Sequence, residues 1–451
     1  MDLAGCFKAY DVRGRVPEEL NPDSVYRIAR AYAQWLMPKR VAVGRDIRHS
    51  SVELSQALIR GLNDSGVDVV DIGLCGTECV YFATFSLKLD GGVMVTASHN
   101  PPEYNGLKFV REDSRPISGD TGLQDIRALA EAGIFEPSPR RGNIVPFEIM
   151  PSWRDHVLGY VDSDKLKPLT IVATAGNGGA GLALDMLEGA LPFRFIKIHH
   201  QPNGDFPNGV PNPMLEENRE VTARNVRLAK ADLGIAWDGD YDRCFFFDED
   251  GRFIDGYYVI GLLARAFLER EPGARIVHDP KLTWNIIDMV RARGGKPVQC
   301  RSGHAFMKDC MRKADAVYGG ETSSHHYFRD FAYCDSGMIP WLVLTQVLCR
   351  SGKPLSLLVN ERMKMFPSSG EINRTIRDVG GAVEAVRQRF VPGSVQVEHV
   401  DGLSVEHPRW RFNLRSSNTE PLLRLNVESR GDRALMQDMT AEILSLVDRY
   451  A

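Results

Sequence analysis

The sequence predicts an α/β protein with three tandem mixed α/β domains of similar topology, followed by a smaller C-terminal α+β domain. The 451 residues are too many for one hydrophobic core and fit three or four domains of roughly 150 residues or fewer. Over most of the chain, short β-branched runs alternate with glycine-containing loops and amphipathic segments, which is typical of largely parallel sheets covered by helices. After about residue 366, apolar and polar residues alternate as in antiparallel strands, before a final amphipathic helix.

The first predicted domain shows this alternation of strands and helices clearly. RVAVGRD (40–46), VDVVDIG (67–73) and GGVMVTAS (91–98) read as strands because they are short and rich in β-branched residues. A helix is expected from about Ser50, where Ser50 and Glu53 match the capping-box pattern.

The same alternation occurs twice more. In the second predicted domain, strands are predicted at 169–176, 194–200 and 233–240, with helices near 180–190 and over 217–231. In the third predicted domain, strands are predicted at 275–279, 296–301 and 316–321, with helices through the 280s and from His304 to Lys313.

Domain boundaries are expected in polar or proline-rich segments, namely EPSPRRGNIVP (136–146), the region around DYDRCFFFDEDG, and MFPSSGE (365–371). These segments predict domains over residues 1–145, 146–247, 248–365 and 366–451.

Composition excludes several classes of partner. The net charge is −4 and the hydrophobic fraction is 43%, so neither general nucleic-acid binding nor membrane-surface binding is expected. The most apolar stretch, MIPWLVLTQVL, is too short to span a bilayer. The eight cysteines are scattered without a CxxC pair, which indicates reduced thiols and a cytoplasmic protein.

The loop DGDYDR carries three alternating acids, Asp238, Asp240 and Asp242, directly after a predicted strand. Three neighbouring carboxylates repel one another unless a cation lies among them, and oxygen ligands favour Mg²⁺ or Ca²⁺. A solvated acidic turn and an EF-hand loop are the alternatives. The EF-hand is disfavoured because Arg243 stands where the sharp turn of that loop needs glycine.

Two further loops carry groups suited to a sugar phosphate. In RSSNTEPLLR, Arg415 can bind phosphate bidentately and the next residues can form a nest of N–H donors, although a plain polar hairpin turn has the same composition. In GGETSSHHYF, Glu321 and Ser323 can hold sugar hydroxyls, and His325 or His326 can transfer a proton. A structural histidine is the alternative reading.

The segment VMVTASHNPPEYNGLKF ends a strand at Ser98 and is then stiffened by two prolines. A hydrolase is disfavoured because the G-x-S-x-G elbow is absent, and adjacent residues such as Ser98 and His99 rarely form an activating hydrogen bond. A serine that carries a phosphoryl group needs a metal and nearby cations. The acidic loop can supply the metal, and Lys108, Arg13 and Arg243 are the candidate cations.

These four loops, TASHNPPEYNGLK, DGDYDR, GGETSSHHYF and RSSNTEP, occur in one order along the full chain, and in this the sequence closely resembles the α-D-phosphohexomutase family, in particular its bacterial phosphomannomutases. The resemblance implies four domains around a central active-site cleft. It also implies that Ser98 is phosphorylated and that Mg²⁺ is bound by Asp238, Asp240, Asp242 and a phosphoserine oxygen.

The resemblance assigns the remaining site residues by position. Proton transfer and positioning fall to Arg13, Lys108 and His325. Contacts to the substrate fall to Arg243, Lys281, His304, Glu321, Ser323, Arg415, Ser417, Asn418 and Thr419, of which the last four surround the non-reacting phosphate.

The implied reaction is the reversible interconversion of mannose 6-phosphate and mannose 1-phosphate through a hexose 1,6-bisphosphate, by a monomer or homodimer. Thr322 and Ser324 depart from the residues common at these positions, so a dual mannose and glucose specificity stays open. A serine hydrolase and a non-catalytic sugar-phosphate or Ca²⁺ sensor are the rival classes.

Overall fold

The structure is a computed structural model that describes residues 2–416 and 422–451. These residues form two compact units. The first unit comprises the chain up to residue 253 together with 325–352, and the second comprises 254–324 and 353–451.

The first sheet combines parallel strands with an antiparallel extension. β2 pairs in parallel with β3 and β4, whereas β5 is antiparallel to both β4 and β1. The strand order is β1 (Val12–Arg15), β5 (Tyr104–Arg111), β4 (Gly91–Val95), β2 (Arg40–Arg45), β3 (Asp68–Leu74) and β6 (Ile144–Pro146).

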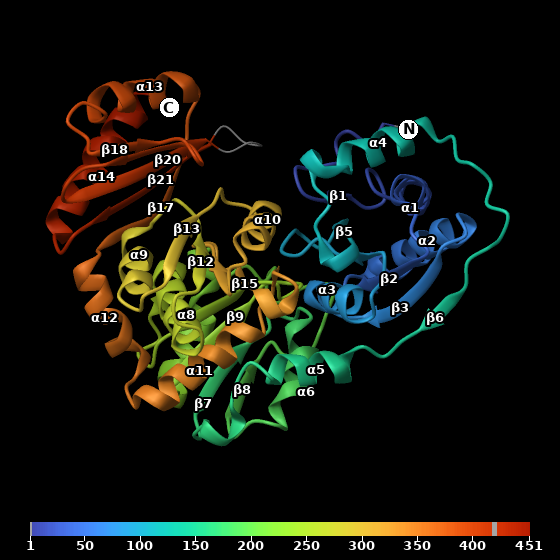
Figure 1. Ribbon diagram of the computed structural model, residues 1–451, viewed down its shortest axis with the longest axis horizontal. Helices are drawn as coiled ribbons and strands as arrows, with labels where there is room; N and C mark the ends of the chain where they lie inside the picture. The colour runs from blue at the N-terminus through green and yellow to red at the C-terminus, as the bar shows by residue number, and fades with distance from the viewer. Residues whose placement is uncertain (1, 417–421) are drawn as a thin grey trace. The chain divides into compact units, whose positions relative to one another are not determined.

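Helices cover both faces of this sheet (Figure 1). The apolar sides of α1 (Pro22–Leu36), α2 (His49–Asp64) and α4 (Leu123–Ala132) pack in one core with Val41, Val43 and other strand residues. α3 (Thr77–Ser86) lies on the other face, where a Cβ on Gly92 would be only 2.8 Å from the Val80 side chain.

The second sheet has the same mixed design. β7 is parallel to β8 and β9, and β10 is antiparallel to β9. The order is β11 (Phe253–Ile254), β10 (Cys244–Phe247), β9 (Leu233–Trp237), β7 (Thr170–Thr174) and β8 (Arg194–Ile198). The helices that accompany it are α5 (Met150–Leu158), α6 (Ala180–Glu188) and α7 (Glu220–Ala229), and the first unit is completed by β15 (His326–Phe328), β16 (Cys334–Asp335) and α11 (Ile339–Ser351).

The second unit begins with another parallel arrangement. β12 (Arg275–His278) is parallel to β13 (Lys296–Gln299) and β14 (Tyr318–Gly320). Four helices belong to this part of the unit, namely α8 (Gly256–Arg270), α9 (Trp284–Arg291), α10 (His304–Ala314) and α12 (Leu355–Met365).

In the C-terminal sheet, all neighbouring strands pair antiparallel over the described residues, and α13 (Val379–Phe390) and α14 (Arg433–Val447) contribute to a core on one of its faces (Figure 1). The strand order is β17 (Ser368–Thr375), β21 (Leu422–Ser429), β20 (Trp410–Ser416), β19 (Leu403–Glu406) and β18 (Gln396–Glu398). Short 3₁₀ helices complete the two units at Glu112–Ser114, Gly119–Thr121, Ser163–Lys165, Glu216–Asn218, Arg329–Phe331 and Asp448–Tyr450.

The predicted fold class is confirmed, but one local prediction is wrong. α2 begins at His49 after Arg48, and no side chain caps its first turn. Ser50 instead accepts a hydrogen bond from Asn105 Nδ2 at 2.8 Å, because β5 competes for its hydroxyl.

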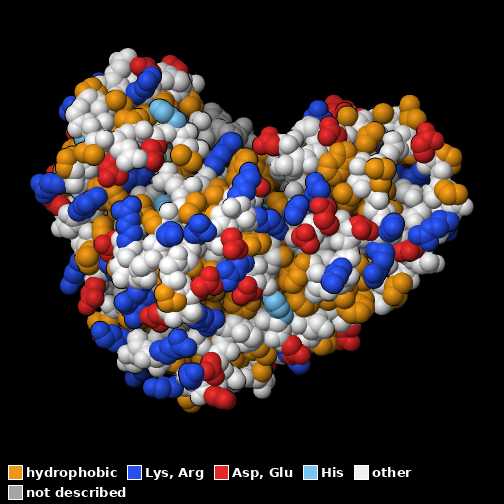
Figure 2. Space-filling view, in the orientation of Figure 1, with side chains coloured by type: hydrophobic (Ala, Val, Ile, Leu, Met, Phe, Trp, Pro, Cys, Tyr) orange, Lys and Arg blue, Asp and Glu red, His pale blue; other side chains and the backbone are white. Residues whose placement is uncertain are grey.

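The surface agrees with the mixed charge of the sequence. In Figure 2, Lys and Arg side chains are interspersed with Asp and Glu over the visible face. Within the described ranges, no single helix has the length and apolar composition of a membrane span, and only the sharply bent pair of α11 and α12 passes when taken together. All eight cysteines are free thiols.

Candidate active site

Ser98 lies in a tight turn just beyond the end of β4. Its φ of +49° is left-handed, and its residue is only 3% exposed. The backbone N–H donates to Thr96 Oγ1 at 2.9 Å, and Ser98 Oγ donates to Asp238 Oδ2 at 3.0 Å. The hydroxyl is therefore held against the acidic loop of the neighbouring sheet in the same unit.

Arg48 fixes the backbone of this turn. Its buried guanidinium donates to the carbonyls of Ser98 at 2.9 Å, Tyr104 at 2.9 Å, and Asn100 and Pro101 at 2.6 Å each. One side chain thus satisfies four backbone acceptors of an irregular loop, which complements the stiffening by Pro101 and Pro102.

The acidic loop follows β9 and is built for close approach. Carboxylate oxygens of Asp238, Asp240 and Asp242 lie within 4.8 Å of one another, and all three residues are buried. Between them, a Cβ on Gly239 would be 2.3 Å from the Ser98 carbonyl oxygen, so only glycine fits. Asp240 Oδ1 is buried without a hydrogen-bond partner among the residues described. Three oxygen donors with one unused lone-pair site suit a hard divalent cation.

The loop does not continue as an EF-hand. β10 begins at Cys244, where an EF-hand would still be coordinating its ion, and the chain then pairs with β9.

Lys108 supplies positive charge to the same cluster. Its Nζ lies 2.6 Å from Asp240 Oδ2 and 2.7 Å from Asp242 Oδ2. Burial opposes the charged form of Lys108, but the two carboxylates hold its pKa above the ordinary value. Burial likewise opposes ionisation of Asp240 and Asp242, yet Lys108 keeps the pKa of each below its ordinary range.

Asp238 behaves differently from its two neighbours. Burial, together with Asp242 and Asp240, raises its pKa to about 6 in spite of the opposing charge of Arg243. Arg243 Nε donates to Asp238 Oδ2 at 2.9 Å, and its Nη2 lies 2.7 Å from His99 Nδ1.

Ser98 and His99 lie within hydrogen-bonding distance of each other although they are adjacent in the chain. Ser98 Oγ lies 3.1 Å from His99 Nδ1, because the left-handed backbone at Ser98 turns the two side chains together. However, the Ser98 hydroxyl donates to Asp238, and His99 Nδ1 accepts from Arg243. Burial and the charges of Arg243 and Arg13 hold the pKa of His99 well below its usual range. His99 is therefore a poor base for activating a serine.

Two other predicted residues lie in this unit. Arg13 is held by Asp11 Oδ2 at 2.8 Å, by the Ala97 carbonyl at 3.1 Å and by Asn100 Oδ1 at 2.5 Å. His325 Nδ1 lies 3.0 Å from Asp335 Oδ2, and its side chain is 19% exposed. The carboxylate orients the imidazole and leaves Nε2 on the opposite edge of the ring.

The second unit holds the predicted sugar-binding loop. Glu321 follows β14 directly, and its Oε1 accepts from the Gly303 N–H at 2.7 Å, immediately before His304. Thr322 donates to Asp279 Oδ2 through its N–H at 2.8 Å and its hydroxyl at 2.9 Å. The loop is thus fixed by backbone and Thr322 contacts, and Ser323 is partly exposed at its turn.

Lys281 and Arg415 lie far apart in the chain, and both approach the carboxylate of Glu371 in this unit. Arg415 Nη2 is 2.9 Å and Lys281 Nζ is 3.8 Å from Glu371 Oε2. Ser417, Asn418 and Thr419, predicted to surround the same phosphate, lie outside the described residues.

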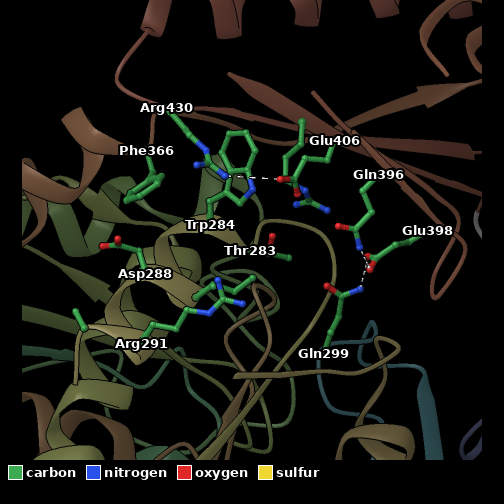
Figure 3. A pocket seen from close by; sticks show the side chains of 13 residues that line it. Thr283, Trp284, Asp288, Arg291, Gln299, Phe366, Gln396, Glu398, Glu406 and Arg430 are labelled. Carbon is green, nitrogen blue, oxygen red and sulfur yellow. Dashed lines mark hydrogen bonds and ion pairs between the residues drawn. The ribbon is translucent and has the colours of Figure 1, made fainter. Parts of the chain in front are cut away.

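A cavity of about 490 Å³ also lies in the second unit, between α9 and the C-terminal sheet (Figure 3). Arg430 stacks over Trp284 at 4.1 Å, and Gln299 donates to Glu398 at 2.7 Å on the other side. Its described lining contains no residue predicted for the site.

Several residues of the site escaped the sequence analysis. Arg48 and Glu371 contact residues far away in the chain, and Asp335 contacts His325 ten residues before it, so no short local motif signals them. Thr77 is a further case, because its hydroxyl donates to Asp240 Oδ2 from the first turn of α3.

Comparison with known families identifies the domains of this chain. The phosphoglucomutase/phosphomannomutase family matches in all four of its domains. Its α/β/α domains I, II and III match residues 4–136, 151–251 and 255–366, and its C-terminal domain matches residues 371–446.

Individual relatives cover nearly the full chain. A phosphomannomutase of Escherichia coli is 55% identical over 98% of this chain and 99% of its own. Proteins described as phosphohexose mutases in Xanthomonas campestris are also 55% identical, over 98% of both chains. The crystal structure of a phosphoglucomutase/phosphomannomutase family protein from Burkholderia thailandensis, 33% identical, superposes with a TM-score of 0.90 over 100% of this chain and 99% of its own. The chain belongs to the phosphoglucomutase/phosphomannomutase family.

Proposed function

We propose that the protein is a phosphomannomutase that interconverts mannose 6-phosphate and mannose 1-phosphate through phospho-Ser98 and a hexose 1,6-bisphosphate. The observation that carries the proposal is the position of Ser98 Oγ, 3.0 Å from Asp238 in a buried cluster of three carboxylates. This position supports the proposal, because phosphoryl transfer depends mainly on positioning and charge neutralisation.

In the first half-reaction, a sugar hydroxyl attacks phospho-Ser98. The bond from phosphorus to Ser98 Oγ breaks as the bond to the sugar oxygen forms, and the hydroxyl proton ends on Ser98 Oγ. His325 is our candidate to relay this proton, because Asp335 orients it and its side chain is partly exposed. Lys108 is a poorer base, since two carboxylates hold its proton. The second half-reaction reverses these steps after the bisphosphate has turned end over end.

Asp238, Asp240 and Asp242 would hold Mg²⁺. The ion supplies charge neutralisation of the phosphoryl oxygens when it is bound. Arg13 and Arg243, which lie beside Ser98, would add positive charge and fix the loop.

The second unit would bind the rest of the substrate. Glu321 and Ser323 would accept and donate hydrogen bonds to sugar hydroxyls, and Lys281, His304 and Arg415 would bind the non-reacting phosphate together with Ser417, Asn418 and Thr419. Because O3 and O4 are alike in mannose and glucose, these contacts give little discrimination at C2.

A dual mannose and glucose specificity is therefore the second candidate. The Xanthomonas campestris relatives favour it, because they are described as phosphohexose mutases, whereas the Escherichia coli relative is described as a phosphomannomutase. We further propose a cytoplasmic monomer or homodimer that binds neither nucleic acid nor membrane.

One assay tests the function. The protein is incubated with Mg²⁺, a trace of hexose 1,6-bisphosphate, and either mannose 1-phosphate or glucose 1-phosphate, and kcat/KM is compared. A phosphomannomutase favours mannose 1-phosphate by at least about tenfold, or roughly 1.4 kcal/mol. Similar values for both sugars support dual specificity. If the protein turns over neither sugar phosphate, the proposal is refuted. A fluorophosphonate probe that labels Ser98 would instead support the hydrolase class.

A further inference from the structure

Asp240 has two carboxylate oxygens in different surroundings. Oδ2 accepts hydrogen bonds from Thr77 Oγ1 at 2.5 Å and from Lys108 Nζ at 2.6 Å. Oδ1 is buried as well, yet it has no hydrogen-bond partner in residues 2–416 and 422–451. A buried carboxylate oxygen without a donor is costly unless a ligand satisfies it. Oδ1 is therefore the oxygen of Asp240 that a cation would bind.

Thr77, the first residue of α3, contacts both members of this ion pair. Lys108 Nζ lies 3.5 Å from Thr77 Oγ1, in addition to its contact with Asp240. An ammonium group only donates hydrogen bonds, and an ionised carboxylate only accepts them. The Thr77 hydroxyl therefore accepts from Lys108 and directs its own proton to Asp240 Oδ2.

The N-terminus of α3 also holds the backbone of the acidic loop. The Gly76 N–H donates to the Tyr241 hydroxyl at 2.9 Å, and the Thr77 N–H donates to the Asp240 carbonyl at 3.4 Å. A Cβ on Gly76 would lie 2.2 Å from the ring of Tyr241, so this close contact requires glycine. These contacts fix the position of the loop, whereas the Thr77 hydroxyl and Lys108 hold the carboxylate itself.

Lys108 alone would hold the Asp240 carboxylate loosely. Its ammonium group is shared, because Nζ also lies 2.7 Å from Asp242 Oδ2. A lysine side chain is long and flexible, whereas the χ1 torsion of a β-branched threonine is restricted. A carboxylate with one mobile partner rotates about χ2 and exchanges its two oxygens, because this torsion has a broad, nearly two-fold profile. Thr77 is therefore the rigid partner of the carboxylate.

We propose that Thr77 is a positioning residue for cation binding, which holds Oδ2 of Asp240 and thereby presents Oδ1 to the ion. The inference rests on the proposed function, in which Asp240 is one of three Mg²⁺ ligands, and it adds a residue that acts through this ligand. Hydrogen-bonded partners of metal ligands orient them, and the loss of such a partner typically costs about 10- to 100-fold in metal affinity.

A purely structural role for Thr77 makes a different prediction. Thr84 provides the comparison, because it lies on the same helix, is buried and donates its hydroxyl to the Val80 carbonyl at 2.7 Å. Loss of either hydroxyl should lower Tm, since each change removes a donor from a buried acceptor. Of the two changes, only the loss of the Thr77 hydroxyl should also weaken cation binding.

The test measures Mn²⁺ binding to the full chain after metal removal with EDTA. Mn²⁺ prefers the same oxygen ligands as Mg²⁺, and the free ion is counted by electron paramagnetic resonance. Five variants are compared with the wild type, namely Thr77→Val, Thr77→Ala, Thr77→Ser, Asp240→Asn and the matched control Thr84→Val. Tm of each metal-free variant is measured beside it, so that a loss of affinity is separated from a loss of stability.

We expect Thr77→Val and Thr77→Ala to raise the dissociation constant for Mn²⁺ about 10- to 100-fold. The alanine variant removes the hydroxyl without placing a methyl group against Asp240, so it gives the result even where the valine variant folds poorly. Thr77→Ser keeps the hydroxyl and should stay within about threefold of the wild type, the difference reflecting its less restricted χ1 torsion. Thr84→Val should bind Mn²⁺ as the wild type does, whatever its Tm.

Three results would overturn the inference. They are a dissociation constant within about twofold of the wild type for both Thr77→Val and Thr77→Ala, a loss in Thr77→Ser as large as that in Thr77→Ala, and an equal loss in Thr84→Val, which would assign the effect to the packing of α3. If Asp240→Asn weakens Mn²⁺ binding in these cases, the metal assignment of the proposed function stands without Thr77. If Asp240→Asn binds Mn²⁺ as the wild type does, that assignment itself is wrong.

Discussion

Gly239 offers a sharp test of the contact between the acidic loop and Ser98. A Cβ at this position would lie 2.3 Å from the Ser98 carbonyl oxygen, at least about 1 Å closer than van der Waals contact allows. That carbonyl cannot easily yield, because it already accepts a hydrogen bond from the buried Arg48. Gly239→Ala must therefore move Ser98 and the acidic loop apart by about 1 Å.

A displacement of this size should act mainly on the chemical step. Misplacing reacting groups by about 1 Å costs on the order of 100-fold in rate, whereas overpacking at one site costs about 1–3 kcal/mol of stability. We expect Gly239→Ala to lower kcat about 100-fold in the mannose 1-phosphate assay, with KM little changed, because the contacts proposed for the substrate lie elsewhere.

The matched control is Gly189→Ala in the same domain. A Cβ on Gly189 meets no atom within 4 Å, and its φ of −64° suits alanine. Activity of this variant should equal that of the wild type. A kcat of Gly239→Ala within about threefold of the wild type would refute the close contact on which the phosphoserine assignment depends.

Four other predictions follow from the site. Ser98→Ala should reduce turnover at least about 1,000-fold while Tm stays within about 2 °C, and near-normal turnover in the coupled assay would exclude the carrier role. Asp240→Asn removes one of the three acidic oxygen donors, so half-maximal activity should need at least about tenfold more Mg²⁺; an unchanged Mg²⁺ titration contradicts the ligand assignment. Arg48→Met leaves four loop carbonyls without their donor. The free energy of unfolding, measured in urea titrations, should therefore fall by about 3–5 kcal/mol. A loss below about 1 kcal/mol would show that the prolines alone hold the loop. Burial raises the pKa of Glu371, but Lys281 and Arg415 hold it below its ordinary value, so ionised Glu371 stabilises the fold above about pH 4.5 and the gain is lost as the pH falls. Glu371→Gln should therefore unfold more easily than the wild type at pH 7, and a difference that persists undiminished at pH 3 would refute this account.

Elements with strong local patterns were predictable from the sequence. β2, β3, β7 and β9 lie where β-branched runs indicated strands, and α10 begins at His304 as expected. Ser98, Asp238 and Glu321 follow strands β4, β9 and β14, as the alternation of strands and loops predicted. Local spacing was sufficient there because each feature depends on neighbours in the chain.

Features that depend on distant residues were not predictable. Ser50 and Glu53 fit a capping box, yet Asn105 from β5 takes the Ser50 hydroxyl. Ser98 Oγ and His99 Nδ1 lie 3.1 Å apart because the turn is left-handed, a conformation that the Ser-His-Asn sequence does not specify. The antiparallel strands that extend the first two sheets likewise depend on pairings between segments with similar apolar patterns.

The first unit combines segments that lie far apart in the chain, and this affects how it folds during synthesis. Buried Glu78 of α3 accepts hydrogen bonds from Trp153 Nε1 at 2.8 Å, the Ser336 hydroxyl at 2.8 Å and the Gly337 N–H at 2.9 Å. During synthesis, the last two partners emerge from the ribosome more than two hundred residues after Glu78 itself. Until then the carboxylate lacks these two donors. The hydrogen bonds of Glu78 are therefore completed only after residues 336 and 337 have been released, so chaperones that bind unfinished chains have a long interval in which to act.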